Sequence, residues 1–210
     1  MTRFIPPDIR STYQGRVIAI GGPPHSGKSV FLNALHNVLL QKIGDRAFLE
    51  RACPDGEGKW FAEADPTLVQ RLRQKGDFSS EFVQAKLSDI ENLGRNKPLV
   101  LLDLGGWRSP ENAAILTKAT DLILLSSQPN EFQPWTEFAQ AQGCQILLQL
   151  ESTLQHNADG TVDSTARSHL DLTIQPATGR MVNLDRAAGQ DSYIHAIQQL
   201  AHWMVSSCFR

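Results

Sequence analysis

The chain has 210 residues, 41% of them hydrophobic and 20% charged, a composition that excludes disordered, collagen-like and coiled-coil proteins. Its 20 Lys and Arg against 22 Asp and Glu give a formal net charge of −2, which argues against a dedicated nucleic-acid-coating or membrane-surface protein. The cysteines Cys53, Cys144 and Cys208 have no metal-binding or disulfide spacing, and the N-terminus lacks a signal-peptide core. We therefore expect a soluble cytoplasmic protein with no membrane segment.

Short apolar runs alternate along the chain with helical patterns, and capping residues mark several helix ends. Gly44 closes the first predicted helix, and Ser109–Pro110 opens another. The predicted strands lie at 16–20, 47–49, 99–103, 122–125, 146–150, 169–174 and 181–184. The predicted helices lie at 28–43, about 65–75, 80–93, from 109 onward, at about 134–142 and at 192–206. The polar stretch 151–167 is predicted to be a surface excursion.

This alternation predicts an α/β fold with a mainly parallel central sheet that is flanked by helices on both faces. No repeat or linker divides the chain. We expect an N-terminal extension over 1–14 and one domain over 15–210.

One loop carries a strong chemical signal, because residues 22–29 (Gly-Pro-Pro-His-Ser-Gly-Lys-Ser) match the phosphate-binding P-loop pattern G-x-x-x-x-G-K-[ST]. The match follows a predicted strand and opens a predicted helix, so backbone N–H groups and the helix N-terminus can point at phosphates. Lys28 would reach the β- and γ-phosphates, and the Ser29 hydroxyl would bind Mg²⁺. The predicted nucleotide-binding residues are Gly22, Pro23, Pro24, His25, Ser26, Gly27, Lys28, Ser29 and Val30. The domain is thus predicted to be a kinase-like P-loop NTPase; the alternative is a glycine turn with an exposed lysine.

An acid, Asp103, ends the otherwise apolar strand 99–103. Burying a carboxylate is costly unless it meets a cation or donors, and P-loop proteins use such an Asp to hold Mg²⁺. We predict Ser29 and Asp103 as the metal ligands and Lys28 and Asp103 as catalytic residues, with a strand-end cap as the alternative for Asp103. Residues 103–106 also fit D-x-x-G, in which a backbone N–H meets the γ-phosphate. No N-K-x-D follows 146–150 to read guanine, so ATP is favoured over GTP.

The motifs at 21–29, 51–58 and 103–112 together resemble the P-loop ATPase domain associated with CRISPR proteins of the Csx type, over nearly the whole chain from Gly15 onward. In that family the domain is often fused behind a small RNA- or cyclic-oligonucleotide-processing module of type III systems. The resemblance implies a role in antiviral defence and a nucleotide or oligonucleotide that is acted on or regulates the protein. It also implies a Csx-type partner or fused module. Because about fifteen residues precede the first strand, we expect a stand-alone chain or the isolated domain of a longer protein.

The acceptor side offers three further candidate catalytic residues. Asp55 and Glu57 follow the second predicted strand, where either carboxylate could orient a hydroxyl acceptor or take its proton; a solvated turn is the alternative. Arg108 could neutralise charge on the γ-phosphate, with a surface pair to Glu111 as the alternative.

Other side chains on this side have two readings each. Trp60 and Phe61 either stack on a base or pack in the core, and the basic residues of 71–75 form either a lid or a solvated face.

Three functions are compatible with these motifs. The first is ATP hydrolysis or phosphoryl transfer to a nucleotide or oligonucleotide acceptor. The second is a regulatory module in which ATP binding orders the loop near Gly105 and changes assembly, homo-oligomerisation included, or a partner's activity. The third, a nucleic-acid-stimulated ATPase, needs a basic surface that the net charge does not indicate.

Overall fold

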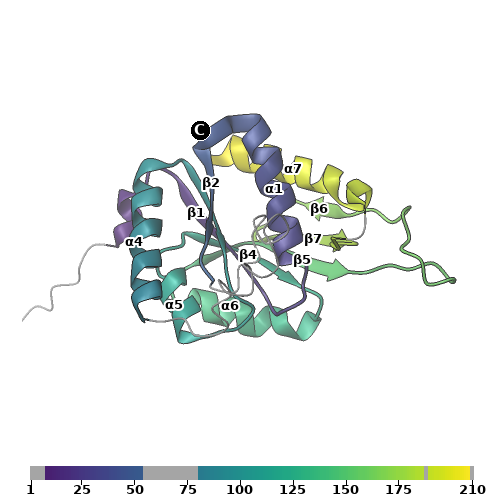
Figure 1. Cartoon of the computed structure of the whole chain (residues 1–210), viewed down its shortest axis with the longest axis horizontal. Helices are drawn as coiled ribbons and strands as arrows, with labels where there is room; N and C mark the ends of the chain where they lie inside the picture. Colours follow the sequence, from purple (N-terminus) through teal and green to yellow (C-terminus); the bar gives the residue numbers. More distant parts are fainter. Residues whose placement is uncertain (1–7, 54–79, 187–188, 209–210) are drawn as a thin grey trace, which may run out of the picture.

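The computed structural model describes residues 8–53, 80–186 and 189–208, which form one seven-stranded sheet with helices on both faces (Figure 1). The strands are β1 (Arg16–Gly21), β2 (Ala47–Arg51), β3 (Leu99–Asp103), β4 (Asp121–Ser126), β5 (Gln145–Thr153), β6 (His169–Asp171) and β7 (Ala177–Val182). The helices are α1 (Lys28–Ile43), α4 (Ser80–Asn96), α5 (Pro110–Leu116), α6 (Phe132–Gln140) and α7 (Ile194–Cys208). None of these described helices is long and apolar enough to cross a membrane.

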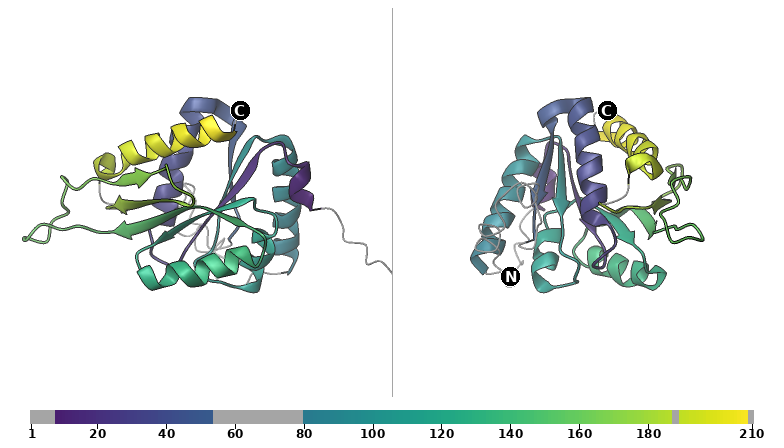
Figure 2. Two further views of the ribbon diagram at one scale, coloured as in Figure 1. Left: turned by 180° about the vertical axis from the view of Figure 1, so that it is seen from behind. Right: turned by 45° about the vertical axis from the view of Figure 1, so that its right-hand side comes forward.

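The strand order is β2-β3-β1-β4-β5-β7-β6, and every pair is parallel except the edge pair β6–β7. Side chains alternate across the central strands. On β1, Ile18 and Ile20 pack in the core beneath α1 and α7, whereas Val17 and Ala19 pack in the core beneath α4, α5 and α6. Figure 2 shows the two helical layers on either side of the sheet. The predicted α/β fold with a mainly parallel sheet is confirmed.

Two helix caps that the sequence predicts are present in the structure. Gly44 follows α1 with a φ of 61°, and its N–H donates to the Leu40 carbonyl. Ser109 precedes α5, where its hydroxyl accepts from the Asn112 N–H at 3.3 Å, and Pro110 occupies the first turn. These local signals explain why α1 ends at Ile43 and why α5 begins at Pro110, as predicted.

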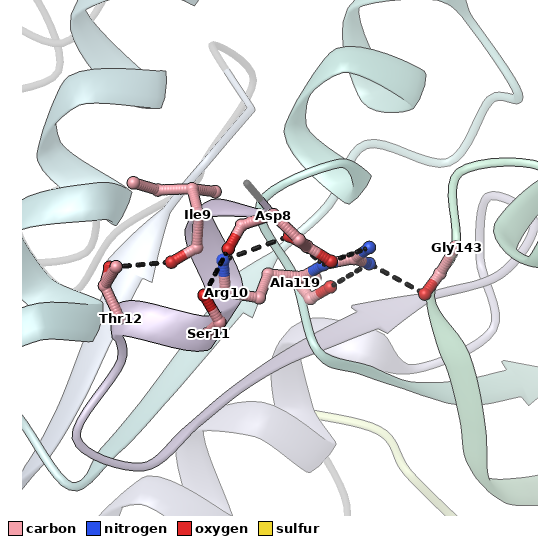
Figure 3. A network of polar contacts seen from close by, with 7 residues as sticks. All are labelled: Asp8, Ile9, Arg10, Ser11, Thr12, Ala119 and Gly143. Atoms are coloured by element: carbon pink, nitrogen blue, oxygen red, sulfur yellow. Dashed lines mark hydrogen bonds and ion pairs between the residues drawn. The ribbon is translucent and has the colours of Figure 1, made fainter. Parts of the chain in front are cut away.

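A short 3-10 turn at the N-terminus fastens the amino ends of two strands (Figure 3). The Arg10 guanidinium donates to the Gly143 carbonyl at 2.7 Å and to the Ala119 carbonyl at 3.4 Å, just before β5 and β4. The Asp8 carboxylate accepts from the Arg10 Nε at 2.8 Å, which fixes the guanidinium. The described part of the predicted extension, residues 8–14, therefore packs on the domain.

The predictions failed partly in the C-terminal third. The strand β5 continues to Thr153, because residues 151–153 pair with β7 in the ladder, so the surface excursion begins only after it. β7 begins at Ala177, four residues before the apolar signal at Met181. β6 ends at Asp171, because the Asp171 carboxylate accepts from the Thr173 N–H at 3.0 Å and turns the chain. The predicted helix at 65–75 lies outside the described residues.

Candidate functional site

The loop between β1 and α1 turns through three residues with positive φ: Gly22 at 136°, His25 at 61° and Gly27 at 80°. A Cβ atom on Gly22 would lie 1.9 Å from the Leu125 carbonyl oxygen, and one on Gly27 would lie 2.7 Å from the Leu184 Cβ. Both backbone conformation and close approach therefore require glycine at these two positions. The loop is therefore held between β4 on one side and the β7–α7 connection on the other.

Lys28, the first residue of α1, points its ammonium group back into the loop. Its Nζ donates to the carbonyl oxygens of Gly22 at 2.8 Å and Pro23 at 2.7 Å, and the side chain is buried. Burial lowers the pKa of Lys28 to about 8, against the opposing influence of Asp103 and Cys53. The ammonium therefore lies in a low-dielectric position where its hydrogen-bond partners are neutral carbonyl groups.

Asp103 ends β3 directly beside the loop, in register with Ile20 of β1 and Arg51 of β2. Its carboxylate is buried and lies 3.7 Å from the Arg51 Nη1. Burial raises the pKa of Asp103, while the charges of Arg51 and Lys28 lower it. The structure thus brings together Lys28 and Asp103, two of the predicted catalytic residues, and adds Arg51, which the sequence did not single out.

The groups that could hold a divalent cation here are oxygen donors. Within residues 8–53, 80–186 and 189–208, no three His, Cys, Asp or Glu side chains gather into a protein-only metal site. Ser29 follows Lys28 in the first turn of α1 and is exposed, and Asp103 closes the neighbouring strand. A hydroxyl and a carboxylate are ligand types that suit Mg²⁺, which keeps several waters and shares substrate phosphates.

The segment after β3 contacts the loop between β1 and α1 through Gly106. A Cβ atom on Gly106 would lie 2.8 Å from the Pro24 backbone nitrogen. The Asn112 amide, buried under this segment, donates to the Trp107 carbonyl at 2.7 Å and to the Gly105 carbonyl at 3.3 Å. The Trp107 side chain itself is 72% exposed. The D-x-x-G segment thus packs against the loop at Gly106 and is followed directly by an exposed aromatic side chain.

Arg108 pairs with Glu131, not with Glu111. Its guanidinium also lies over the Trp135 ring, 5.8 Å from the centroid. The Ser109 hydroxyl hydrogen bonds to Glu111 and lowers the pKa of that carboxyl, as expected in the first turn of a capped helix. Sequence proximity suggested the wrong partner because the Arg108 side chain points toward the turn that precedes α6.

The remaining acceptor-side candidates, Asp55, Glu57, Trp60, Phe61 and the basic residues of 71–75, lie outside the described residues. Of the predicted acceptor loop, only its start at Ala52 and Cys53 is described, and the Ala52 N–H donates to the Asp103 carbonyl at 3.0 Å. The strand that leads into this loop therefore ends next to Asp103.

A pocket of about 850 Å³ opens on the other side of the P-loop. The predicted residues from His25 to Val30 form one wall, and His25 is exposed there. The sequence analysis missed the rest of the lining, which lies at the carboxyl ends of β4, β5 and β7 or just after them: Ser127, Ser152, Thr153, Leu154, Leu184, Asp185 and Arg186. The rule that ligands bind at the carboxyl ends of parallel strands could have found them.

These features define the class of protein: an α/β protein with a mainly parallel sheet, in which the loop between β1 and α1 has the sequence pattern of a P-loop. No protein-family model matches the chain, and no curated protein matches it. Among solved structures, it is similar to a nucleotide-binding protein from Archaeoglobus fulgidus, solved in complex with ADP and with cobalt. That similarity has a TM-score of 0.47 and 18% sequence identity, and it covers 74% of this chain and 75% of the other. A likeness at this level carries no argument about function.

Proposed function

We propose that this chain binds ATP with Mg²⁺ at the P-loop and either hydrolyses it or transfers its γ-phosphoryl group to an acceptor. The observation that carries the proposal is the position of the Lys28 ammonium, which is buried at the centre of the loop with carbonyl oxygens as its hydrogen-bond partners. A buried cation in such surroundings is stabilised by an anion, and the loop amides and the N-terminus of α1 favour a phosphate there.

Each residue has a defined task in this proposal. Lys28 would exchange its carbonyl partners for phosphate oxygens, and the loop from Gly22 to Gly27 would donate its N–H groups to them. Ser29 and Asp103 would hold Mg²⁺, which supplies positive charge against the phosphates when bound. The attacking oxygen, from water or an acceptor hydroxyl, forms a bond to the γ-phosphorus while the bond to the bridging oxygen breaks, so that ADP leaves. The proton of the attacking oxygen passes to Asp55, to Glu57 or to solvent.

The binding test compares two lysines of the same helix. ATP·Mg²⁺ binding and phosphate release are measured for the wild type, Lys28→Ala and Lys42→Ala, because Lys42 is exposed near the C-terminal end of α1. We expect Lys28→Ala to weaken binding or turnover at least about 100-fold, as loss of a charged phosphate contact does, and Lys42→Ala to match the wild type. Undiminished binding and turnover in Lys28→Ala would reject the proposal.

Arg108 and the acceptor-loop carboxylates are further parts of the proposal. If Arg108 neutralises charge in the transition state, Arg108→Ala lowers kcat about 100-fold and leaves the Kd for ATP unchanged. Glu131→Gln should instead raise kcat, because it releases Arg108 from its ion pair without removing the guanidinium. Asp55 and Glu57 are proposed to orient the acceptor, and their amide variants should reduce transfer more than ATP binding.

The acceptor is proposed to be a nucleotide or an oligonucleotide, in a CRISPR-linked antiviral role. This finer proposal rests on the sequence motifs at 51–58 and 103–112, which resemble the Csx-type family. A screen with γ-labelled ATP over mononucleotides, linear oligonucleotides and cyclic oligonucleotides tests it. Label transfer to one of these classes supports the proposal, and release of the label only as inorganic phosphate assigns the chain to ATP hydrolysis.

A regulatory module is the second candidate function, and the packing of Gly106 against Pro24 favours it. A change in the P-loop would move this glycine and, with it, the neighbouring exposed Trp107. In that case ATP·Mg²⁺ changes the sedimentation of the protein, or its binding of a partner, while phosphate release stays negligible. Trp107→Ala should then abolish the change in assembly and leave ATP affinity intact.

A further inference from the structure

A second cavity lies away from the P-loop, in the corner between α6 and the sheet. Its volume is about 560 Å³, which is in the range of pockets that enclose a small molecule. Its walls come from the second half of α6, the first half of β5 and the residues just before β7. Among the described residues it shares none with the P-loop or with the pocket beside that loop, so it is a separate cavity.

A β-bulge in β5 turns one polar side chain into this cavity. The ladder with β4 shifts its register at Leu147, which is an extra residue between the paired Ile146 and Leu148. As a result, Leu147 and Leu148 both pack in the core beneath α1 and α7, and Gln149 lies on the face that α6 covers. Regular alternation would place Gln149 on the opposite face from Ile146. Bulges that redirect a side chain in this way are common next to functional sites.

The Gln149 carboxamide is held across the gap between β5 and α6. Its Nε2 donates to the Thr136 hydroxyl at 3.2 Å, and the side chain is half-buried. A carboxamide has two N–H donors and a carbonyl oxygen that accepts, so this bond to a described residue uses one of the donors. An N–H and a carbonyl oxygen are the two groups with which a glutamine binds the edge of a heterocyclic base.

Three more glutamines surround the opening of the cavity. Gln140 of α6, Gln145 of β5 and Gln175 before β7 are exposed at its rim. The buried Ile146 and the half-buried Pro176 supply apolar surface. Apolar faces with a few hydrogen-bonding groups at their edges suit a flat ring that carries donors and acceptors.

The lining that the structure describes contains no Lys, Arg, Asp or Glu. The Arg10 guanidinium lies next to Gly143, but it donates to the Gly143 and Ala119 carbonyl groups and pairs with Asp8. The thiol of Cys144 is uncharged at neutral pH, because burial raises its pKa to about 12. A phosphate or carboxylate would lose hydration in this cavity without a cation to replace it, so the lining favours an uncharged ligand.

We propose that this cavity binds an uncharged nitrogen heterocycle, a nucleobase or its nucleoside, and that Gln149 hydrogen bonds to the edge of the ring. The faces of such a ring contact Ile146 and Pro176, and its donors and acceptors pair with the carboxamides at the rim. The ligand binds independently of ATP, because the cavity and the P-loop share no described residue.

The test titrates adenosine, guanosine, cytidine and uridine into the whole chain by calorimetry, without ATP. The pocket variants are Gln149→Met, which keeps the length of the side chain and removes the amide, and Gln140→Ala at the exposed rim. Gln133→Ala is the matched control, because Gln133 is an exposed glutamine of the same helix outside the cavity lining. Lys28→Ala controls for binding at the P-loop.

We expect at least one nucleoside to bind the wild type with a Kd of about 0.1 mM or tighter, the affinity typical of a ligand with about 19 non-hydrogen atoms. Gln149→Met should weaken this binding about three- to tenfold and Gln140→Ala about threefold, as loss of neutral hydrogen bonds does. Gln133→Ala and Lys28→Ala should match the wild type. In Lys28→Ala, the 5′-monophosphate should bind no more tightly than the nucleoside, because the cavity offers its phosphate no cation.

Absence of binding by all four nucleosides in the millimolar range overturns the proposal. Unchanged affinity in both Gln149→Met and Gln140→Ala also overturns it, and so does a loss that occurs only in Lys28→Ala, since that places the nucleoside at the P-loop. The midpoint of urea unfolding shows whether Gln149→Met keeps the fold, and the exposed Gln140→Ala decides the matter if it does not. None of these outcomes affects the proposal of ATP binding, which has its own test.

Discussion

A methyl group at Gly22 tests whether the P-loop is held by the close approach of two backbone segments. In Gly22→Ala the added Cβ would lie 1.9 Å from the Leu125 carbonyl oxygen, where ordinary contact begins at 3.4 Å. The loop and β4 must therefore separate by about 1.5 Å, the difference between these two distances. Because the Gly22 carbonyl accepts from Lys28, the same movement disturbs the charged hydrogen bond at the centre of the loop.

The magnitude follows from two contributions. A φ of 136° is a strained conformation for alanine, which costs about 1–3 kcal/mol, and loss of a hydrogen bond to a charged group costs about 1.5–3 kcal/mol. We expect Gly22→Ala to lower the free energy of unfolding by about 3–5 kcal/mol. The control is Gly44→Ala, which also has a positive φ of 61° but no atom within 4 Å of the new Cβ, so it should cost only the backbone strain of about 1–3 kcal/mol.

Urea unfolding, followed by circular dichroism without any ligand, measures both variants. A difference in midpoint at equal slope reports stability alone. If Gly22→Ala loses no more free energy of unfolding than Gly44→Ala, the contact with Leu125 does not constrain the loop, and the argument from close approach is wrong.

Three further predictions concern charge and capping. Arg16→Ala leaves the buried carboxylate of Asp121 without its cation and should lower the free energy of unfolding by about 3–5 kcal/mol. Arg180→Ala breaks an exposed ion pair with Glu151 and should lower it by at most about 1 kcal/mol. Similar losses for the two variants in urea unfolding would contradict this prediction. The pKa of Lys28 falls from 10.5 to about 8 on folding, so the unfolded chain binds more protons between these pH values. Lys28 should therefore add stability as the pH rises through that window, and the difference between wild type and Lys28→Met should show it; a constant difference would disprove the lowered pKa. Ser109→Ala removes the cap of α5 and should lower the free energy of unfolding by about 1 kcal/mol, while an unchanged thermal midpoint would show that the cap contributes nothing.

The sequence was sufficient for elements whose boundaries are set locally. Gly27 and Gly44 delimit α1 through their own backbone conformations, and Ser109 with Pro110 starts α5. The apolar run of β3 is continuous because both faces of the central sheet are covered. The P-loop and Asp103 were found for the same reason, since each is a short motif attached to such an element.

The parts that the sequence analysis missed depend on contacts between distant segments. The polar residues from Glu151 to Thr153 extend β5 only because β7 pairs with them, about 29 residues later. Asn183 shows no local signal for the hydrogen bonds of its buried side chain, because its partners lie in the stretch after β5 and in the segment before α7. Arg108 was matched with a neighbour in sequence, whereas its partner Glu131 lies beyond α5 and β4.

The N-terminal turn that fastens Gly143 and Ala119 has a consequence for how the domain moves. With Arg10 on these two carbonyl groups and Arg16 on Asp121, the amino end of the sheet is cross-linked by charged hydrogen bonds. The carboxyl end has instead a pocket on one side of the P-loop. Amide hydrogens near the amino end should therefore exchange slowly with solvent, and we expect any rearrangement that accompanies ligand binding to involve the opposite end. The strands are therefore fixed to one another by side chains at their amino ends, whereas at their carboxyl ends they border an open pocket.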